Sequence, residues 1–204
     1  MTTKTIILAS NNQGKIREFN HLLINTDLEI IPQKDLAIND VEETGLSFVE
    51  NAILKARHAA QQGGFPAIAD DSGIEVDALH GAPGIYSARF AGQGASDTEN
   101  IALLLSRLAA VPEAHRSARY HCVIVYMRHA TDPMPIICQG TWEGSVLYTP
   151  RGTQGFGYDP VFYVPTHQCS AAELPAAIKN QLSHRSQALQ ALQYILQSMS
   201  YPKN

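Results

Sequence analysis

The stretch TIILASNNQGKIREFNHLL, residues 5–23, sets the pattern for the first part of the chain. A short apolar run opens it, a polar loop follows, and the apolar residues after the loop recur at the spacing of one helix face. These apolar residues are Ile16, Phe19, Leu22 and Leu23. We therefore expect a buried strand over residues 4–9 and a helix over residues 14–24, an order typical of α/β proteins.

Further apolar runs extend this pattern along the chain. They predict strands over residues 28–31, 66–71 and 120–130, one or two strands within 135–148, and a short strand after a glycine loop within 152–165. Helices are expected over residues 47–61, 97–110 and 184–199, with a Ser47–Glu50 capping box, an Asp97 N-cap and a Ser183 N-cap. Because strands cluster after residue 119, we expect an α/β fold with a mixed β-sheet and flanking helices, compatible with two lobes around a central cleft.

Length and composition narrow the class of protein. The chain has 204 residues, 45% of them hydrophobic, which is enough for one domain with a sizeable core. A formal net charge of −4 argues against a general nucleic-acid binder. Without a run of ~20 apolar residues we expect no membrane span, and three widely spaced cysteines fit a reduced, cytoplasmic setting.

The loop SNNQGK, residues 10–15, resembles a P-loop without matching it. Ala9 stands where the P-loop pattern requires its first glycine, and Ile16 stands where it requires the metal-binding hydroxyl. The machinery of P-loop kinases and GTPases is therefore excluded.

The same loop still has the ingredients of an anion site. Asn11, Asn12 and Gly14 tolerate positive φ, and a strand-to-helix junction points free N–H groups outward. Lys15 adds a positive charge that a helix N-terminus does not otherwise favour, which makes sense beside a phosphate. An ordinary turn with a solvated lysine remains the alternative.

Acidic residues gather at two places in the first half. Asp70 and Asp71 are expected to end a strand and to point to opposite faces, so that one carboxylate could bind Mg²⁺ while the other does a different job. An Asx turn that closes the strand is the alternative. Glu42 and Glu43 precede the predicted helix that carries Lys55, whose face could be turned either to a cleft or to water.

Two further motifs lie in the second half. In GTQGFGYDP, residues 152–160, glycines allow close backbone approach, and Phe156 and Tyr158 could stack on a base or belong to the core. In SHR, residues 183–185, two basic side chains lie in a first helical turn, where the macrodipole disfavours cations. A hydrogen-bonding task for these side chains is the natural explanation.

Together these motifs resemble the inosine triphosphate pyrophosphatase family, also called the Ham1-like family. The resemblance is carried by SNNQGK, EETGLSFVENAILKA, ADDSG, GAPGIYSARFAG, GFGYDP and SHR, which occur in the family's order over nearly the whole chain. It implies a single catalytic domain over residues 1–204, an elongated mixed α/β fold in two lobes, and a homodimer. It also implies Mg²⁺-dependent hydrolysis of ITP, dITP and XTP to the monophosphate and pyrophosphate, which clears deaminated purines from the nucleotide pool.

Residue roles follow from the same resemblance. Asp71 would accept the proton of the attacking water, and Glu42 and Asp71 would help to place the metal. The phosphates would be held by residues 10–15, with Lys55 also reaching phosphate, while Phe156 stacks on the base and Lys179, His184 and Arg185 meet the purine edge. The implied substrate-binding residues are Ser10, Asn11, Asn12, Gln13, Gly14, Lys15, Lys55, Ser72, Phe156, Gly157, Tyr158, Asp159, Lys179, His184 and Arg185.

Two other functions compete with this one. An enzyme of the same fold could act on modified pyrimidine triphosphates, but Phe156 with the SHR cluster suits a 6-oxopurine better. A nucleotide-binding module without catalysis ranks last, because Asp71 is present.

Overall fold

The computed structural model describes residues 4–23 and 28–200. It divides the chain into two units. Unit 1 comprises Met1–Asp71, Cys122–Gly140 and Arg185–Asn204, and unit 2 comprises Ser72–His121 and Thr141–His184. The division agrees with the two lobes expected from the sequence, while the cleft stays a prediction. Seven strands of the described residues form one open mixed sheet, in the order β2-β1-β3-β4-β5-β6-β7.

Unit 1 is built on parallel strands. β1 (Lys4–Leu8) pairs in parallel with β2 (Leu28–Pro32) and with β3 (Ala67–Val76). The later part of β4 (Ser117–Met127) and the earlier part of β5 (Ile136–Val146) continue this side of the sheet. The alternation of strands and helices in the sequence therefore predicted the α/β character of this unit.

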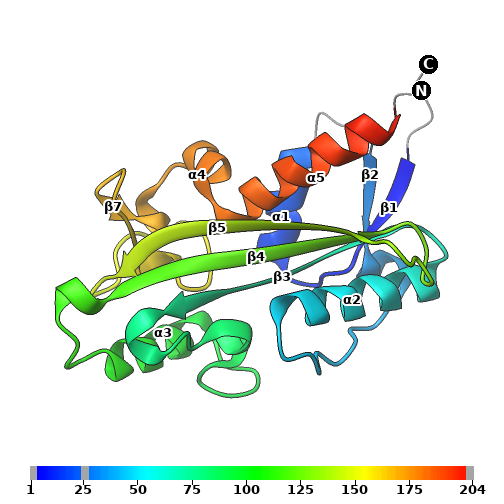
Figure 1. The fold of residues 1–204 in the computed structure, drawn as a ribbon. Coiled ribbons are helices and arrows are strands. Elements are labelled where there is room, and N and C mark those ends of the chain that lie inside the picture. The colour runs from blue at the N-terminus through cyan, green and yellow to red at the C-terminus, as the bar shows by residue number, and fades with distance from the viewer. Residues whose placement is uncertain (1–3, 24–27, 201–204) are drawn as a thin grey trace. The chain divides into compact units, whose positions relative to one another are not determined.

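Helices cover both faces of the sheet in unit 1 (Figure 1). α1 (Gln13–Leu23) and α5 (His184–Ser200) pack on one face, where Phe19 and Leu189 meet Ile68 in a buried cluster. α2 (Phe48–Gly63) covers the other face with a run of small residues, because alanine side chains let a helix lie close to the strands. The alanines of this contact are Ala52, Ala56, Ala59 and Ala60.

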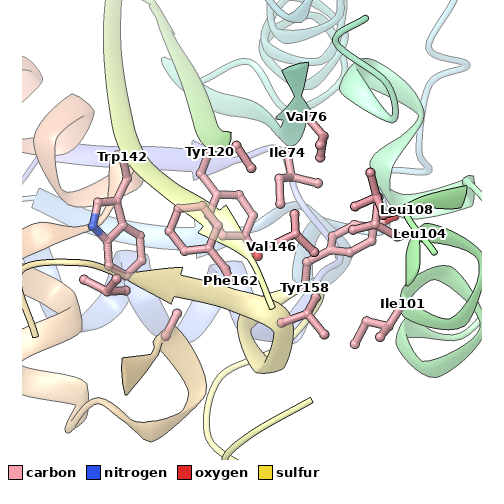
Figure 2. Close-up of a cluster of buried hydrophobic side chains, with 14 of the residues drawn as sticks. Ile74, Val76, Ile101, Leu104, Leu108, Tyr120, Trp142, Val146, Tyr158 and Phe162 are labelled. Carbon is pink, nitrogen blue, oxygen red and sulfur yellow. The ribbon is translucent and has the colours of Figure 1, made fainter. Parts of the chain in front are cut away.

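Unit 2 is built on antiparallel strands around an aromatic core. β6 (Phe162–Val164) pairs antiparallel with β5 and with β7 (Cys169–Ser170), and two helices, α3 (Asp97–Arg107) and α4 (Ala176–Leu182), complete the unit. Tyr120, Trp142 and Phe162 pack ring against ring at its centre (Figure 2). Short 3-10 turns in the described chain lie at Gln33–Leu36, Asp77–Leu79, Gly84–Arg89, Glu113–His115, Asp159–Val161 and Ala171–Glu173.

The structure corrects the predicted end of one strand. β3 does not stop at Asp70 and Asp71 but continues to Val76, so both acids lie in the middle of a ten-residue strand. The pairing partners of its later part come from β4, far along the chain, and local composition does not reveal them. Of the one or two strands expected within residues 135–148, the structure has one, β5, over Ile136–Val146.

The predicted cap of α3 is wrong, whereas the predicted Ser47 cap of α2 is confirmed. α3 is capped by Ser96 rather than Asp97, because Ser96 and Glu99 form a reciprocal capping box. In α2 the Ser47 side chain accepts from the Glu50 N–H as expected, whereas the Glu50 carboxylate accepts from the Leu46 N–H at 2.9 Å. Within the described residues, no helix is long and apolar enough to cross a membrane.

Candidate active site

The loop of residues 10–15 is organised by side-chain caps. Asn12 Oδ1 accepts from the Lys15 N–H at 3.0 Å and so caps α1, and Ser10 Oγ accepts from the Asn12 N–H at 3.2 Å. Asn11 Nδ2 donates to Asp40 at 2.9 Å.

The backbone of this loop differs from the expectation of positive φ. Asn11, Asn12 and Gly14 do not appear among the described residues with positive φ, and α1 already begins at Gln13. The asparagines therefore serve as hydrogen-bonding groups, and Gly14 lies buried in the first helical turn.

Asp70 is the centre of a buried charge cluster in unit 1. Its Oδ2 lies 3.0 Å from Lys15 Nζ and 3.1 Å from Arg185 Nη2, and Arg185 also bonds Glu18. The Asp70 side chain is fully buried, and Arg185 is 2% exposed. Burial would raise the pKa of Asp70, but Lys15 and Arg185 outweigh it and hold that pKa well below its usual range. Asp70 is therefore an ionised carboxylate that fixes two cations.

Asp71 points to the opposite face of β3, as adjacent strand residues must. Its Oδ1 lies 2.7 Å from Lys55 Nζ, and the same Nζ lies 2.8 Å from Glu43 Oε1. Asp71 Oδ2 is buried and has no hydrogen-bond partner among the described residues. The predicted division of the two acids between two faces is thus confirmed.

The charges around Asp71 suit a proton acceptor. Burial is the largest influence, and it raises the pKa of Asp71. The positive charges of Lys55 and Lys15 oppose this rise, whereas the negative charge of Glu43 adds to it. The net effect is a raised pKa. For Lys55, burial lowers the pKa, but Asp71, Asp70 and Glu43 outweigh it, so the ammonium stays charged. A carboxylate with a raised pKa is a better general base than an ordinary one.

The acids near Asp71 fit a magnesium ion held largely by water and substrate. Mg²⁺ typically binds through one or two carboxylates together with waters and phosphates. Asp71 offers a buried oxygen without a protein partner, and Glu43 shares Lys55 with it. Among the described residues no group of three metal-ligating side chains exists. Glu42, the predicted ligand, is exposed, and its role as a ligand stays a prediction.

A second candidate site lies in unit 2, around Phe156. Lys179 Nζ lies 5.1 Å from the centre of the Phe156 ring and 2.5 Å from Asp159 Oδ2. Asp159 Oδ2 also accepts from the Phe156 N–H at 2.9 Å. Gly155 has φ 78° and an added Cβ would lie 2.0 Å from the Asp159 carboxylate, so the loop requires glycine there. This loop holds a half-buried ring above a buried ion pair.

The remaining predicted base-site residues of unit 2 have different surroundings. His184 stacks on Tyr120 with ring centres 4.6 Å apart and is 5% exposed. Tyr158 belongs to the core, and its hydroxyl donates to the Ser87 carbonyl at 2.8 Å, which favours the core alternative for this ring. The Gly157 N–H donates to Asp97 at 2.6 Å.

Comparison with known proteins places the chain. The Ham1 family model matches residues 6–195. The chain belongs to the Ham1 family. A relative from Vibrio parahaemolyticus named dITP/XTP pyrophosphatase is 58% identical over 189 residues, which is 93% of this chain and 94% of that protein. A relative of the same name from Shigella flexneri is 56% identical over 92% of this chain and 95% of its own length.

Solved structures of the Ham1 family share the fold. A Ham1 protein from Coxiella burnetii matches with a TM-score of 0.89 and 51% identity, over 96% of this chain and 99% of that one. A structure named nucleoside-triphosphatase / dITP/XTP pyrophosphatase from Mycobacterium abscessus matches with a TM-score of 0.74 and 37% identity, over 92% and 98%. The mixed α/β fold expected from the sequence is confirmed.

Within this Ham1 chain the predicted site residues fall into two groups. Residues 10–15, Lys55, Asp71 and Arg185 belong to unit 1, whereas Ser72, residues 156–159, Lys179 and His184 belong to unit 2.

Sequence reasoning missed the roles of Glu18, Glu43 and Asp70 as partners of the cations. Glu18 bonds Arg185, which lies 167 positions further along the chain, so no local pattern predicts this pair.

Proposed function

We propose that this chain hydrolyses dITP, ITP and XTP to the nucleoside monophosphate and pyrophosphate. The observation that carries the proposal is the likeness, across more than nine tenths of both chains, to relatives named dITP/XTP pyrophosphatase. The chemistry of unit 1 supports it, because a buried carboxylate with one open oxygen lies beside a lysine. The class of enzyme is a nucleoside triphosphate pyrophosphohydrolase.

The charge balance of unit 1 supports Mg²⁺ as the cofactor. Lys15, Lys55 and Arg185 are set against four carboxylates, so the cluster carries one excess negative charge when all groups are ionised. A triphosphate adds further negative charge, and side chains of this cluster do not neutralise it. Bound Mg²⁺ supplies that positive charge and polarises the phosphate oxygens. Glu42 or Glu43 would hold it directly, and Asp71 would help to place it through a bound water.

In this mechanism the chain's own residues bind phosphate and take up a proton. Lys15, the first turn of α1 and Lys55 bind phosphate oxygens. Asp71 accepts the proton of the attacking water at Oδ2 as the water oxygen bonds to the α-phosphorus. The bond between the α-phosphorus and the α–β bridging oxygen breaks, and that oxygen leaves with pyrophosphate. Lys55 holds the other oxygen of Asp71 and so fixes its orientation. Pyrophosphate leaves, and the monophosphate remains as the second product.

The base is proposed to bind at the Phe156 loop of unit 2. The ring offers a stacking surface, and Lys179 and His184 offer donors for O6 of hypoxanthine or xanthine. Adenine, with an amino group at that position, would leave such donors unpaired. Ser72, Gly157, Tyr158 and Asp159 would complete the walls. Arg185, which bonds Asp70 and Glu18, is proposed to meet the purine edge as well.

The proposal also covers domain organisation, location, oligomeric state and partners. Residues 1–204 act as one catalytic domain, since the Ham1 family model spans residues of both units. The enzyme is proposed to be a cytoplasmic homodimer. Neither nucleic acid nor a membrane is proposed as a partner.

The test is an assay of pyrophosphate release. The purified protein is incubated with Mg²⁺ and, separately, with ITP, XTP, dITP, GTP, ATP, dUTP or CTP. We expect strong preference for the first three. Equal turnover of ATP, or orthophosphate as the direct product, would contradict the proposal, and preference for a pyrimidine would favour the competing function.

A further inference from the structure

The acidic segment before α2, residues 42–46, is fastened by side chains of that helix. Asn51 Oδ1 accepts from the Gly45 N–H at 2.8 Å, and Glu50 Oε2 accepts from the Leu46 N–H at 2.9 Å. Lys55, one helical turn beyond Asn51, bonds the side chain of Glu43. A segment without regular structure is thus held at three points by one helix.

The backbone of this segment lies directly on α2. A Cβ added at Gly45 would come within 2.6 Å of Glu50 Cβ and within 2.7 Å of Asn51 Oδ1. Real Cβ atoms do not approach so closely, so glycine is required here by proximity. The Gly45–Asn51 contact therefore sets how near the acidic segment can lie to Lys55 and Asp71.

The Asn51 amide does more than hold the acidic segment, because the described residues bond its oxygen but not its nitrogen. The residue is fully buried, and its Oδ1 must face Gly45, since an N–H group bonds only an acceptor. Its Nδ2 is then a buried donor with no hydrogen-bond partner among the described residues. Burying a donor in this way is costly, so an oxygen atom from outside the chain is the expected acceptor.

A second asparagine in the same chain shows what a purely structural clamp looks like. Asn100 in α3 is 2% exposed and accepts from the Ala91 N–H at 2.8 Å, as Asn51 does from Gly45. Its Nδ2, however, donates to the Ala88 carbonyl at 3.3 Å. The fold therefore uses the whole Asn100 amide, whereas it leaves the donor of Asn51 for another group.

We propose that Asn51 is a positioning residue for the metal-binding acids of this enzyme. Through Gly45 it holds the acidic segment so that Glu43 meets Lys55 beside Asp71, and its Nδ2 donates to an oxygen that enters with the hydrated metal. The inference rests on the proposed function. Neither the motif resemblance nor the family match assigns this role to Asn51.

The test compares Asn51→Ala with the matched control Asn100→Ala. Titration with Mn²⁺ alone, followed by electron paramagnetic resonance, measures metal binding without turnover. Loss of an outer-sphere partner typically weakens metal binding about 10- to 100-fold, and we expect a rise in the Kd for Mn²⁺ of that order in Asn51→Ala. Asn100→Ala should lower Tm but leave the Kd for Mn²⁺ unchanged.

If Asn51→Ala does not fold, two further variants, Asn51→Asp and Gly45→Ala, test the same contact. Asn51→Asp retains the acceptor for Gly45 and should keep the segment in place, so it should bind Mn²⁺ far better than Asn51→Ala. Gly45→Ala breaks the same contact from the other side and should weaken Mn²⁺ binding. Wild-type Mn²⁺ affinity in Gly45→Ala, or in a folded Asn51→Ala, would overturn the inference.

The outcomes also separate this inference from the function on which it rests. A wild-type protein that binds Mn²⁺ and releases pyrophosphate, together with an unaffected Asn51→Ala, refutes the role of Asn51 alone. A wild-type protein that releases no pyrophosphate from any nucleotide refutes the proposed function, and the inference falls with it.

Discussion

The two units carry candidate sites of opposite character. In unit 1, cations and carboxylates alternate on both faces of β3, and each lysine that could bind phosphate already touches an acid. In unit 2, one buried ion pair, Lys179 with Asp159, lies beneath an aromatic ring. The core of that unit combines aliphatic side chains with the rings of Tyr120, Trp142, Tyr158 and Phe162 (Figure 2). The charges of unit 1 suit proton transfer and metal binding, whereas the ring and ion pair of unit 2 suit recognition of a flat, polar base.

This difference predicts where substitutions act. Changes in unit 1 should lower kcat or the stability of the fold, because its charges depend on one another. Changes around Phe156 should raise KM and alter base preference, because stacking contributes to binding before and during the reaction. A kcat effect around Phe156, or an effect on base preference in unit 1, would contradict this assignment.

The largest effect is expected for Asp71→Asn. An amide cannot take up the proton of the attacking water, and general-base catalysis typically contributes 10²–10⁴-fold, so kcat for dITP should fall by about that factor. Steady-state kinetics and thermal unfolding measure activity and folding together. Asp77→Asn, an exposed aspartate of unit 2, serves as the control. Near-wild-type turnover in Asp71→Asn would remove Asp71 from the mechanism.

The next effect is on stability, for Asp70→Asn. Loss of this carboxylate removes the partner of Lys15 in the cluster and leaves Arg185 paired with Glu18 alone. Breaking a buried ion pair from one side typically costs about 3–5 kcal/mol in the free energy of unfolding. Urea denaturation at neutral pH measures the loss. A cost below that of an ordinary surface substitution would show that Glu18 alone neutralises the cluster.

A smaller effect is expected for Phe156→Ala. Stacking of a base on an aromatic side chain is typically worth about 1–3 kcal/mol, so KM for dITP should rise while kcat changes little. The comparison of KM for dITP with KM for inorganic tripolyphosphate isolates the base. Equal increases for the two compounds would place Phe156 at the phosphates instead.

These two sites were predictable from sequence to different degrees. The strand, loop and helix of residues 5–23 were predicted because apolar periodicity is a local signal, and adjacency alone predicted that Asp70 and Asp71 face apart. The continuation of β3 to Val76 was missed because it depends on pairing with β4. The burial of Tyr158 and the partners Glu18 and Glu43 depend on contacts between distant segments, which no local pattern encodes.

The smallest effect concerns Asp77, an exposed counterpart of Asp70. Hydrogen bonds from Arg119 and Ser117 lower the pKa of Asp77 to about 2. A carboxyl whose pKa is depressed on folding stabilises the protein above its ordinary pKa of about 4, and that stabilisation disappears as the pH falls through about 2. Because the Asp77 side chain is 49% exposed, solvent screens the pair, and the gain at neutral pH should be about 0.2–1 kcal/mol.

Urea denaturation of wild type and Asp77→Asn at pH 7, 4 and 2 measures this contribution. We expect a small difference in the free energy of unfolding at pH 7 that shrinks toward pH 2, and a smaller difference in high salt because exposed charges are screened. If Asp77→Asn cost as much at pH 7 as Asp70→Asn, burial would not be what separates the two networks. The loss of stability expected for Asp70→Asn could then not be attributed to the burial of its ion pairs.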